Sequence, residues 1–484
     1  MKIEALVFSS FLLMSFFIGA LAARSIRGIS DFFVAGAKMP WYFLTGTFVA
    51  SNVSAGLFLG ATNMAGNHGY AVYSSFFTTA IGYLISIAIV GVFVRRLSQH
   101  YKIYDFADIL ATRYVSHAAA IRMITTLVLP VVYIPLLAAQ FIALATITES
   151  IFGITYESSL LVISLLIVAY TVLGGMLGVV WTDGFQFLVL LFGLLLAVPI
   201  AMSYAGGGSS DLGWEYIKEL PPEIFNWTNQ DWPWQVVMGQ FAWIFAAPVM
   251  PHLITRFLTA KDERQILIAL PVSLTLGMII FASVIPLGLL GRVAYPDLAQ
   301  GEYYYLALAR SHLGPVFGSF ALSGIAAAAL STCSTCLMIT GQSISKEIYQ
   351  KIFSPNASDE HMLFAARVTI TVIGIITFAI AYIKLLSIFW LVVLSASLLA
   401  SIFFIPVMAG FFSEKASAKG AIAAALAGGS SALIVFVVNE ALGTYYFVSE
   451  LFAGLTASAI CMIIFSYRYP PTSEERSVYY RIRS

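Results

Sequence analysis

Charged side chains are scarce in this sequence. Asp, Glu, Lys and Arg together make up 10% of its 484 residues, whereas soluble globular proteins carry about 25%. This deficit excludes a water-soluble enzyme of the ordinary kind. The positive and negative charges nearly cancel, leaving a net charge of +1, so no excess of basic charge points to a nucleic-acid partner. The sequence leaves the oligomeric state open.

Cysteine is also rare, with three residues in the whole chain. All three lie in apolar runs, so their pattern indicates neither a disulfide framework nor a zinc site. Cys333 and Cys336 form a C-x-x-C pair inside a predicted membrane helix. We interpret this pair as small packing residues rather than as a redox or metal-binding motif.

The phosphate-binding motif G-x-x-x-x-G-K-[ST] is missing, and no stretch of the sequence reads as an appended soluble domain. These two absences exclude a receptor kinase and an ATP-driven transporter within one chain. Any transport would therefore draw its energy from an ion gradient or from a partner protein.

Apolar residues are abundant, at 60% of the chain. They form about thirteen runs of about 20 residues, the length that crosses a bilayer as a helix. Because unpaired backbone groups are too costly in lipid, the runs predict an all-α, polytopic membrane protein. The first run is interpreted as a retained helix rather than a signal peptide, because Arg24 and Arg27 follow it. The predicted spans are 4–23, 40–66, 70–94, 123–148, 156–174, 179–205, 233–255, 265–291, 314–345, 368–383, 386–412, 420–440 and 443–466.

Basic residues gather in every second loop. If the N-terminus lies outside, about twenty of the 25 Lys and Arg fall in inner loops or in the tail. Arg256 is counted among them, at the inner end of the seventh span. The bias predicts a multi-pass protein of the cell membrane (inner or plasma membrane) with a cytoplasmic C-terminus.

Small and polar residues interrupt the second span, in "GTFVASNVSAGLFLG" at residues 46–60. Ser51, Asn52 and Ser54 lie in its middle, where short polar side chains compete with the hydrogen bonds of the helix. A discontinuous helix of this kind releases carbonyl groups that bind a cation or a solute. A close contact between helices through small residues is the other interpretation, and the segment alone does not decide between them.

Two prolines mark the seventh span, in "WIFAAPVMPHLITRF" at residues 243–257. Pro248 and Pro251 each remove a backbone donor, which favours a true break over a simple kink. Trp243 lies about one turn before this break. His252 could carry a proton, but its position near the inner end favours a structural role.

Hydroxyl groups are concentrated in the ninth span, in "AAAALSTCSTC" at residues 326–336. At the spacing of a helix, Ser331, Ser334 and Thr335 share a face, with Thr332 beside them. Hydroxyl oxygens suit a small hard cation. The alternative is that each hydroxyl binds a carbonyl of its own helix.

Asp183 is an acidic residue that opens the sixth span, in "VVWTDGFQF". It is interpreted either as a helix N-terminal residue favoured by the helix dipole or as a carboxylate on the path of an ion.

The two interrupted spans lie five spans apart. Spans 2–6 and 7–11 would form two halves of opposite orientation, the 5+5 inverted repeat of many secondary transporters. The domain prediction is one transporter domain over 1–484, divided into an extra helix (4–23), a first repeat (40–205), a second repeat (233–412), two C-terminal helices (420–466) and a cytoplasmic tail (467–484).

Several motifs in order resemble the sodium:solute symporter family, which has a LeuT-type core. They are "SDFFVAGAKMPWY", "YDFADILATRY", "YTVLGGMLGVVWTDGFQ", "PHLITRFLTAKD" and "AAAALSTCST", and the likeness runs from about residue 28 to 470. The branches it resembles most transport pantothenate, monocarboxylates or proline. The resemblance implies a membrane transporter rather than an enzyme, with Na⁺ and a small-molecule solute as its cargo and the lipid bilayer as its surroundings.

The resemblance also implies particular binding residues. The main sodium site would take backbone carbonyls from Ala50, Val53 and Ala328 and hydroxyls from Ser331 and Thr332. Some members hold a further sodium, whose ligands here would be Asp183, Ser334 and Thr335. The solute would contact Ser51, Asn52, Ser54, Gln140, Trp243 and Ala247.

Two of these positions depart from the proline branch, which has aspartate at the place of Asn52 and tyrosine at the place of Ala247. We expect no Arg or Lys in the middle of the membrane, so an anionic solute would be held by amides, hydroxyls and bound sodium. The prediction is a sodium-coupled symporter that imports a small polar solute by alternating access, such as a monocarboxylate, pantothenate or an amino acid. The alternatives are a proton-coupled permease using Asp183 or His252, and a transporter-like sensor.

Overall fold

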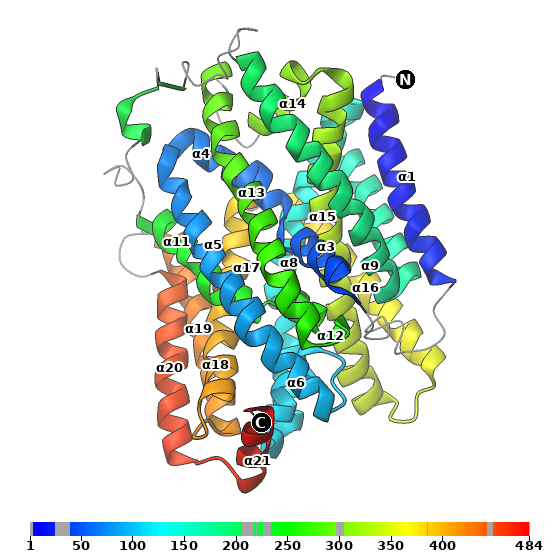
Figure 1. Ribbon diagram of the computed structural model, residues 1–484. Coiled ribbons are helices and arrows are strands. Elements are labelled where there is room, and N and C mark those ends of the chain that lie inside the picture. The colour runs from blue at the N-terminus through cyan, green and yellow to red at the C-terminus, as the bar shows by residue number, and fades with distance from the viewer. Residues whose placement is uncertain are drawn as a thin grey trace.

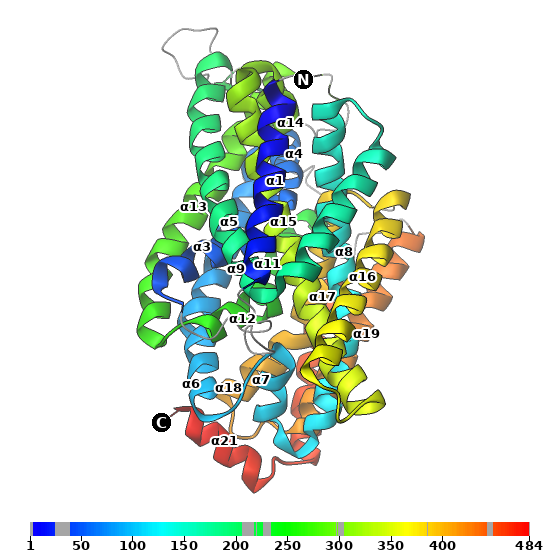
Figure 2. The ribbon, with the colours of Figure 1, turned by 90° about the vertical axis from the view of Figure 1, so that its right-hand side faces the viewer.

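The computed structural model describes residues 3–24, 39–205, 217–218, 220–225, 234–296, 298, 304–384, 386–442 and 449–483. Within these residues the chain is helical almost throughout and forms no strand, so the predicted all-α class is confirmed. The helices run mostly along one direction and form a tall bundle (Figures 1 and 2). The motif at 30–42 falls largely outside the described residues.

Each predicted span has a helical counterpart, although several ends differ. The tenth span begins at Asp359 rather than 368, because Ser358 caps a polar first turn that the apolar run does not include. In chain order the helices of the spans are α1 (Ile3–Ala23), α3 (Trp41–Asn52) with α4 (Thr62–His68), α5 (Tyr73–Ile85) with α6 (Val92–His100), α8 (Ala118–Phe152), α9 (Tyr156–Ala205), α11 (Trp234–Ala246) with α12 (Pro251–Thr259), α13 (Glu263–Ala294), α15 (Gly314–Ile344), α16 (Asp359–Ile383), α17 (Ile388–Leu399) with α18 (Ile405–Phe412), α19 (Ala418–Leu442) and α20 (Glu450–Arg468). The shorter helices are α7 (Phe106–Arg113), α14 (Tyr304–His312) and α21 (Ser473–Arg483).

The described part of the chain contains fewer candidate membrane helices than the thirteen predicted spans. Eleven helices in the described part of the chain are long and apolar enough to cross a membrane. Span 40–66 is not among them, and spans 156–174 and 179–205 are counted once because the helix α9 continues from one to the other across a kink at Gly175. The count of thirteen therefore stays a prediction.

Helix α9 reverses its direction at Gly175. This residue takes φ 53° and ψ −163°, a left-handed backbone conformation that glycine adopts far more readily than other residues. Before the reversal, the Tyr156 hydroxyl donates to the Ala381 carbonyl near the end of α16, and Arg367, nearer the start of α16, binds the Val172 carbonyl. The first part of α9 thus runs antiparallel to α16, and the second part returns along α15 (Figure 2).

Helix α15 forms the centre of the bundle (Figure 1). All of its residues from Ala321 to Ser343 are buried, and it packs closely against α9, α8 and α16. Because α15 is enclosed by protein, its hydroxyl groups face other helices rather than lipid. The start of α1 and the helix α21 lie at opposite ends of the molecule, which fits an odd number of crossings (Figure 1).

Both predicted broken helices are interrupted, which confirms this part of the prediction. α3 ends at Asn52 and is followed by Val53 in an extended conformation (φ −76°, ψ 116°), before the chain turns helical again towards α4. The other break lies at Met250 (φ −68°, ψ 112°), between a short 3₁₀ turn and α12, whose first residue is Pro251. The backbone thus leaves the helix in nearly the same way in both halves.

The start of α3 and the end of α12 are joined by backbone hydrogen bonds. The Met39 amide donates to the Thr259 carbonyl at 2.9 Å, and the Lys261 amide donates to the Met39 carbonyl at 3.0 Å. Trp41, the first residue of α3, donates its amide to the Gln265 side chain at 3.0 Å. The start of α3 is therefore coupled directly to the end of α12.

Candidate functional site

The break in α3 faces the hydroxyl-rich part of α15. The Ser331 hydroxyl lies 2.7 Å from the Ala50 carbonyl oxygen and 3.0 Å from the Ala328 carbonyl oxygen. Thr332 Oγ1 lies 3.0 Å from the same Ala328 oxygen and 3.4 Å from the Ser51 carbonyl oxygen. Oxygens from two helices therefore meet at one point. Four of the five residues that the family resemblance implies for the main sodium site, Ala50, Ala328, Ser331 and Thr332, lie together here, and their role as ligands stays a prediction.

Val53, the remaining member of that predicted set, supplies the extended residue that ends α3. Its amide donates to the Val49 carbonyl at 2.9 Å. Because Val53 leaves the helix, the carbonyl groups just before it lose their regular helical donors. This explains why the Ala50 and Ser51 carbonyls are free to accept hydroxyl groups from α15. Neutral oxygens grouped in this way are suitable ligands for a small hard cation.

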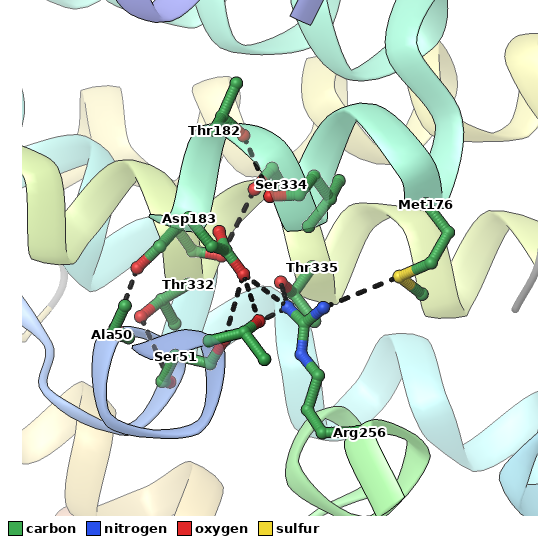
Figure 3. Close-up of polar contacts among 12 residues, drawn as sticks. Ala50, Ser51, Met176, Thr182, Asp183, Arg256, Thr332, Ser334 and Thr335 are labelled. Atoms are coloured by element: carbon green, nitrogen blue, oxygen red, sulfur yellow. Dashed lines mark hydrogen bonds and ion pairs between the residues drawn. The ribbon is translucent and has the colours of Figure 1, made fainter. Parts of the chain in front are cut away.

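A buried ion pair lies beside this point (Figure 3). Arg256 Nη2 is 2.7 Å from Asp183 Oδ2, and both side chains are 0% exposed. The same carboxylate oxygen accepts hydrogen bonds from the hydroxyls of Thr47 at 2.8 Å and Ser51 at 3.4 Å. The other oxygen, Asp183 Oδ1, has no hydrogen-bond partner.

The expectation about the place of Arg256 is wrong, because the pattern of basic residues assigns it to the loop after span 7. The structure instead places Arg256 within the membrane-length helical segment Gln240–Thr259, fully buried. Because α12 continues to Thr259, the arginine lies inside the helix rather than after it. The signal was present in "PHLITRFLT", where apolar residues flank the arginine on both sides.

Ser334 and Thr335, the other two residues predicted for a second sodium, lie about one turn further along α15 than Ser331. Thr335 Oγ1 accepts a hydrogen bond from Arg256. The Ser334 hydroxyl donates to the Ser331 carbonyl in its own helix, at 3.1 Å. The structure therefore brings Asp183 and Thr335 together through the guanidinium of Arg256. Thr47 was not predicted, although its spacing of one helical turn from Ser51 places both on the same face.

A small cavity lies beside the break in the first broken helix. Its volume is about 40 Å³, room for a few water molecules. The polar part of its wall includes Asn52, Ser54 and Gln240, and the aromatic part includes Trp243, Phe281 and Phe389. The side-chain nitrogens Asn52 Nδ2 and Gln240 Nε2 are buried without a hydrogen-bond partner.

Four of the residues predicted to contact a solute line this cavity or the one beside it. Ser51 joins Asn52, Ser54 and Trp243 at the second cavity. Ala247 is fully buried and packs against Gly82 of α5. Gln240 and Phe281 were not predicted, because a glutamine one turn before Trp243 and an isolated phenylalanine in α13 carry no distinctive sequence signal.

Gln140, the last predicted solute residue, binds the backbone at the break in the first half. Its side-chain oxygen accepts the Ala55 amide at 2.9 Å. Two helical turns earlier in α8, the Tyr133 hydroxyl oxygen accepts the His252 amide at 3.0 Å, just after the break in the second half. One helix thus satisfies a freed backbone donor at each break, because breaks leave amides without helical partners.

His252 itself is buried and engaged. Its Nδ1 atom lies 3.1 Å from the same Tyr133 hydroxyl. The two rings also meet edge to face, with centroids 5.6 Å apart. This arrangement agrees with the structural role that its position in the sequence favours.

A second group of buried acids lies near the C-terminal end of α15. Oxygens of Asp105, Asp108 and Glu347 lie within 4.8 Å of one another. Lys346 Nζ binds Asp105 at 3.1 Å and Asp108 at 2.5 Å, Arg122 binds Asp108 at 3.0 Å, and Lys351 pairs with Glu347. Three side-chain cations therefore balance the three acids. Burial raises the pKa of Asp105 above its ordinary value. Burial would raise the pKa of Asp108 too, but Lys346 and the Tyr104 amide outweigh it and lower that pKa overall.

Comparison with known proteins identifies relatives of the whole chain. A family model described as "Sodium:solute symporter family" matches residues 32–428. The high-affinity proline transporter PutP of Bacillus subtilis is 26% identical over 362 residues, covering 74% of this chain and 75% of that protein. The sodium/pantothenate symporter of Escherichia coli is 26% identical over 434 residues, covering 89% of each chain.

Solved structures share the same fold. A Na⁺-coupled sialic acid symporter, solved in a substrate-bound outward-open state, superimposes with a TM-score of 0.79 at 20% identity, covering 98% of this chain and 99% of the other. A nucleobase-cation-symport-1 family transporter superimposes with a TM-score of 0.56 at 15% identity, covering 93% and 98%. At identities as low as these, the likeness concerns the arrangement of the helices alone.

Proposed function

Because the chain belongs to the sodium:solute symporter family, a family of multi-pass membrane transporters, we propose that it imports a small solute together with Na⁺ by alternating access. The observation that carries the proposal is the meeting of two α15 hydroxyls with the carbonyls released at the break of α3. Sodium would bind the carbonyls of Ala50, Val53 and Ala328 and the hydroxyls of Ser331 and Thr332. We also propose that the N-terminus lies outside the cell and the C-terminus inside.

Sodium couples to the solute through the broken helix. A cation held between α3 and α15 would fix the position of Ser51, whose carbonyl contacts Thr332. The next residue, Asn52, and then Ser54 line the cavity proposed for the solute. An ion drives such a cycle only if it binds the outward and inward states with different affinity. The membrane potential adds about 2.3 kcal/mol per charge for every 100 mV.

The solute is proposed to carry a hydrogen-bond acceptor, most simply a carboxylate, on an apolar body. Two buried side-chain nitrogens without partners, Asn52 Nδ2 and Gln240 Nε2, lie in the cavity wall beside aromatic rings. An unpaired buried donor is costly, so a bound acceptor would relieve it. Proline and pantothenate, the cargo named for two relatives, both carry a carboxylate. Ser51, Ala247 and Gln140 complete the proposed solute contacts, with Gln140 holding the backbone at Ala55.

Sodium coupling is tested by uptake into proteoliposomes with sodium replaced by choline at fixed pH. We expect uptake to fall to the level of empty vesicles, and unchanged uptake would favour the proton-coupled alternative. The solute is identified by thermal stabilisation of the purified protein, with sodium present, against amino acids, sugars and monocarboxylates. Stabilisation by a sugar without any carboxylate, and not by a carboxylate, would contradict the proposed solute class.

A further inference from the structure

The guanidinium of Arg256 fills the place between α3, α9 and α15 where an additional cation would sit. Its Nη2 atom contacts Asp183 Oδ2 at 2.7 Å, the Ser51 hydroxyl at 3.0 Å and Thr335 Oγ1. Its Nη1 atom lies 3.6 Å from Met176 Sδ. Three helices thus direct their oxygens at one positively charged group (Figure 3).

Arg256 and a sodium ion compete for the same oxygens. Of the ligands expected for a second sodium, Asp183 Oδ2 and Thr335 Oγ1 both accept hydrogen bonds from the arginine, and the Ser334 hydroxyl binds its own helix. Asp183 Oδ1 is the one oxygen of that carboxylate without a partner. The Asp183–Arg256 pair is neutral and completely buried. A sodium ion in the place of the guanidinium would have to displace it from Asp183, leaving the Arg256 charge buried without a partner, which is strongly unfavourable.

The position of Arg256 on α12 favours a lasting contact between Arg256 and Ser51. Arg256 lies in the middle of this short helix, between Pro251 at its start and Thr259 at its end. Thr259 is tied to α3 through the Met39 amide. Arg256 on α12 and Ser51 on α3 are therefore carried by two segments that are joined where α3 begins and α12 ends.

We propose that Arg256 is a resident cation that replaces a second sodium, so that the protein binds one sodium ion and transports one per solute. This inference rests on the proposed sodium symport. It also makes Arg256 a positioning residue for the main site. The guanidinium binds the hydroxyl of Ser51, whose carbonyl oxygen lies 3.4 Å from Thr332 Oγ1.

Equilibrium binding of ²²Na⁺ to the purified full-length protein tests the proposal without knowledge of the solute. We expect about one ion per protein for the native chain and about two for Arg256→Gln, because the freed carboxylate of Asp183 then needs a counter-ion. The double variant Arg256→Gln/Asp183→Asn removes the carboxylate too, and its count should return to about one. Arg256→Lys keeps the charge and should also bind about one.

Each possible number of bound sodium ions either supports or overturns the proposed role of Arg256. Two ions bound by the native protein, or one ion bound by Arg256→Gln in a folded state, would overturn the role of Arg256 while leaving sodium symport intact. No ion bound by the native protein would overturn the proposed function itself. If Arg256→Gln does not fold, the native count and the double variant, in which the charge is balanced, still provide the test.

Discussion

At Ser331 and Thr332, helix α15 meets only neutral oxygens, whereas one turn further along Thr335 meets a complete ion pair. The same run of small hydroxyl residues thus lies beside two positions with opposite electrostatic needs. The first position lacks a positive charge and is suited to receive one from outside. The second already contains one in Arg256, balanced by Asp183. Hydroxyl groups alone do not show whether a position binds a transported ion or a fixed side-chain cation. The presence of Asp183 and Arg256 beside the second position makes that distinction.

The largest expected effect comes from removing one charge of the pair. Asp183→Asn leaves the Arg256 charge buried without a partner, which should lower the free energy of unfolding by about 3–5 kcal/mol. Thermal unfolding in detergent measures the loss. The double variant Asp183→Asn/Arg256→Gln has no charge to balance and should recover most of it. Equal stability of the single and double variants would contradict the tight pairing of these two charges.

At the neutral position the expected effect is on sodium rather than on folding. Ser331→Ala and Thr332→Ala each remove a proposed ligand and should raise the sodium concentration for half-maximal uptake by about tenfold to a hundredfold. Stability without sodium should change little. Ser323→Ala is the matched control, because Ser323 is buried in the same helix and its hydroxyl has no partner. Unaltered sodium dependence in both variants would show that the ligand assignment is wrong.

A smaller effect should follow from releasing the backbone at the breaks. Gln140→Met removes the acceptor for the Ala55 amide, and Tyr133→Phe removes the acceptor for the His252 amide. An unsatisfied buried donor costs about 1–3 kcal/mol, so each variant should unfold at lower temperature. Thr148→Val is the control, because that hydroxyl binds only a carbonyl of its own helix. A loss no greater than that of the control would mean that the freed amides find other partners.

The smallest effect is expected at the cysteines beside the hydroxyls. Cys333 and Cys336 are buried free thiols, and the interpretation of them as packing residues predicts little effect on sodium. Replacing either by alanine should cost about 1 kcal/mol of stability and leave the sodium dependence of uptake unchanged. A shift in sodium affinity as large as that of Ser331→Ala would place a thiol among the ligands and remove the distinction between the two kinds of residue.

The sequence predicted the helical class and both breaks because these depend on local patterns. Apolar runs set the helices, and the prolines around Met250 and the small polar residues around Val53 set the interruptions. It also predicted that Ser331 would lie near Ala50, through the family resemblance. Arg256 could not be placed in this way. Its burial depends on Asp183, which is distant in sequence, and a rule based on counting charges assigns an arginine near a helix end to the loop.

The ends of several helices escaped prediction for a related reason. Polar first turns, such as the one capped by Ser358, extend a helix beyond its apolar run. The reversal at Gly175 falls in the gap between the predicted spans 156–174 and 179–205, whereas the helix that continues directly on both sides of it was not predicted. Gln140 was expected beside the solute, and its bond to the Ala55 amide appears only once the break has formed.

The two contacts of α8 with the breaks lie about two helical turns apart on one helix. Gln140 binds the first broken helix at Ala55, and Tyr133 binds the second at His252. Any tilt of a broken helix that keeps its bond to α8 would displace the residues far from the break more than the break itself. The bonds to α8 would therefore hold nearest to their places the parts of both broken helices from which the proposed ligands come.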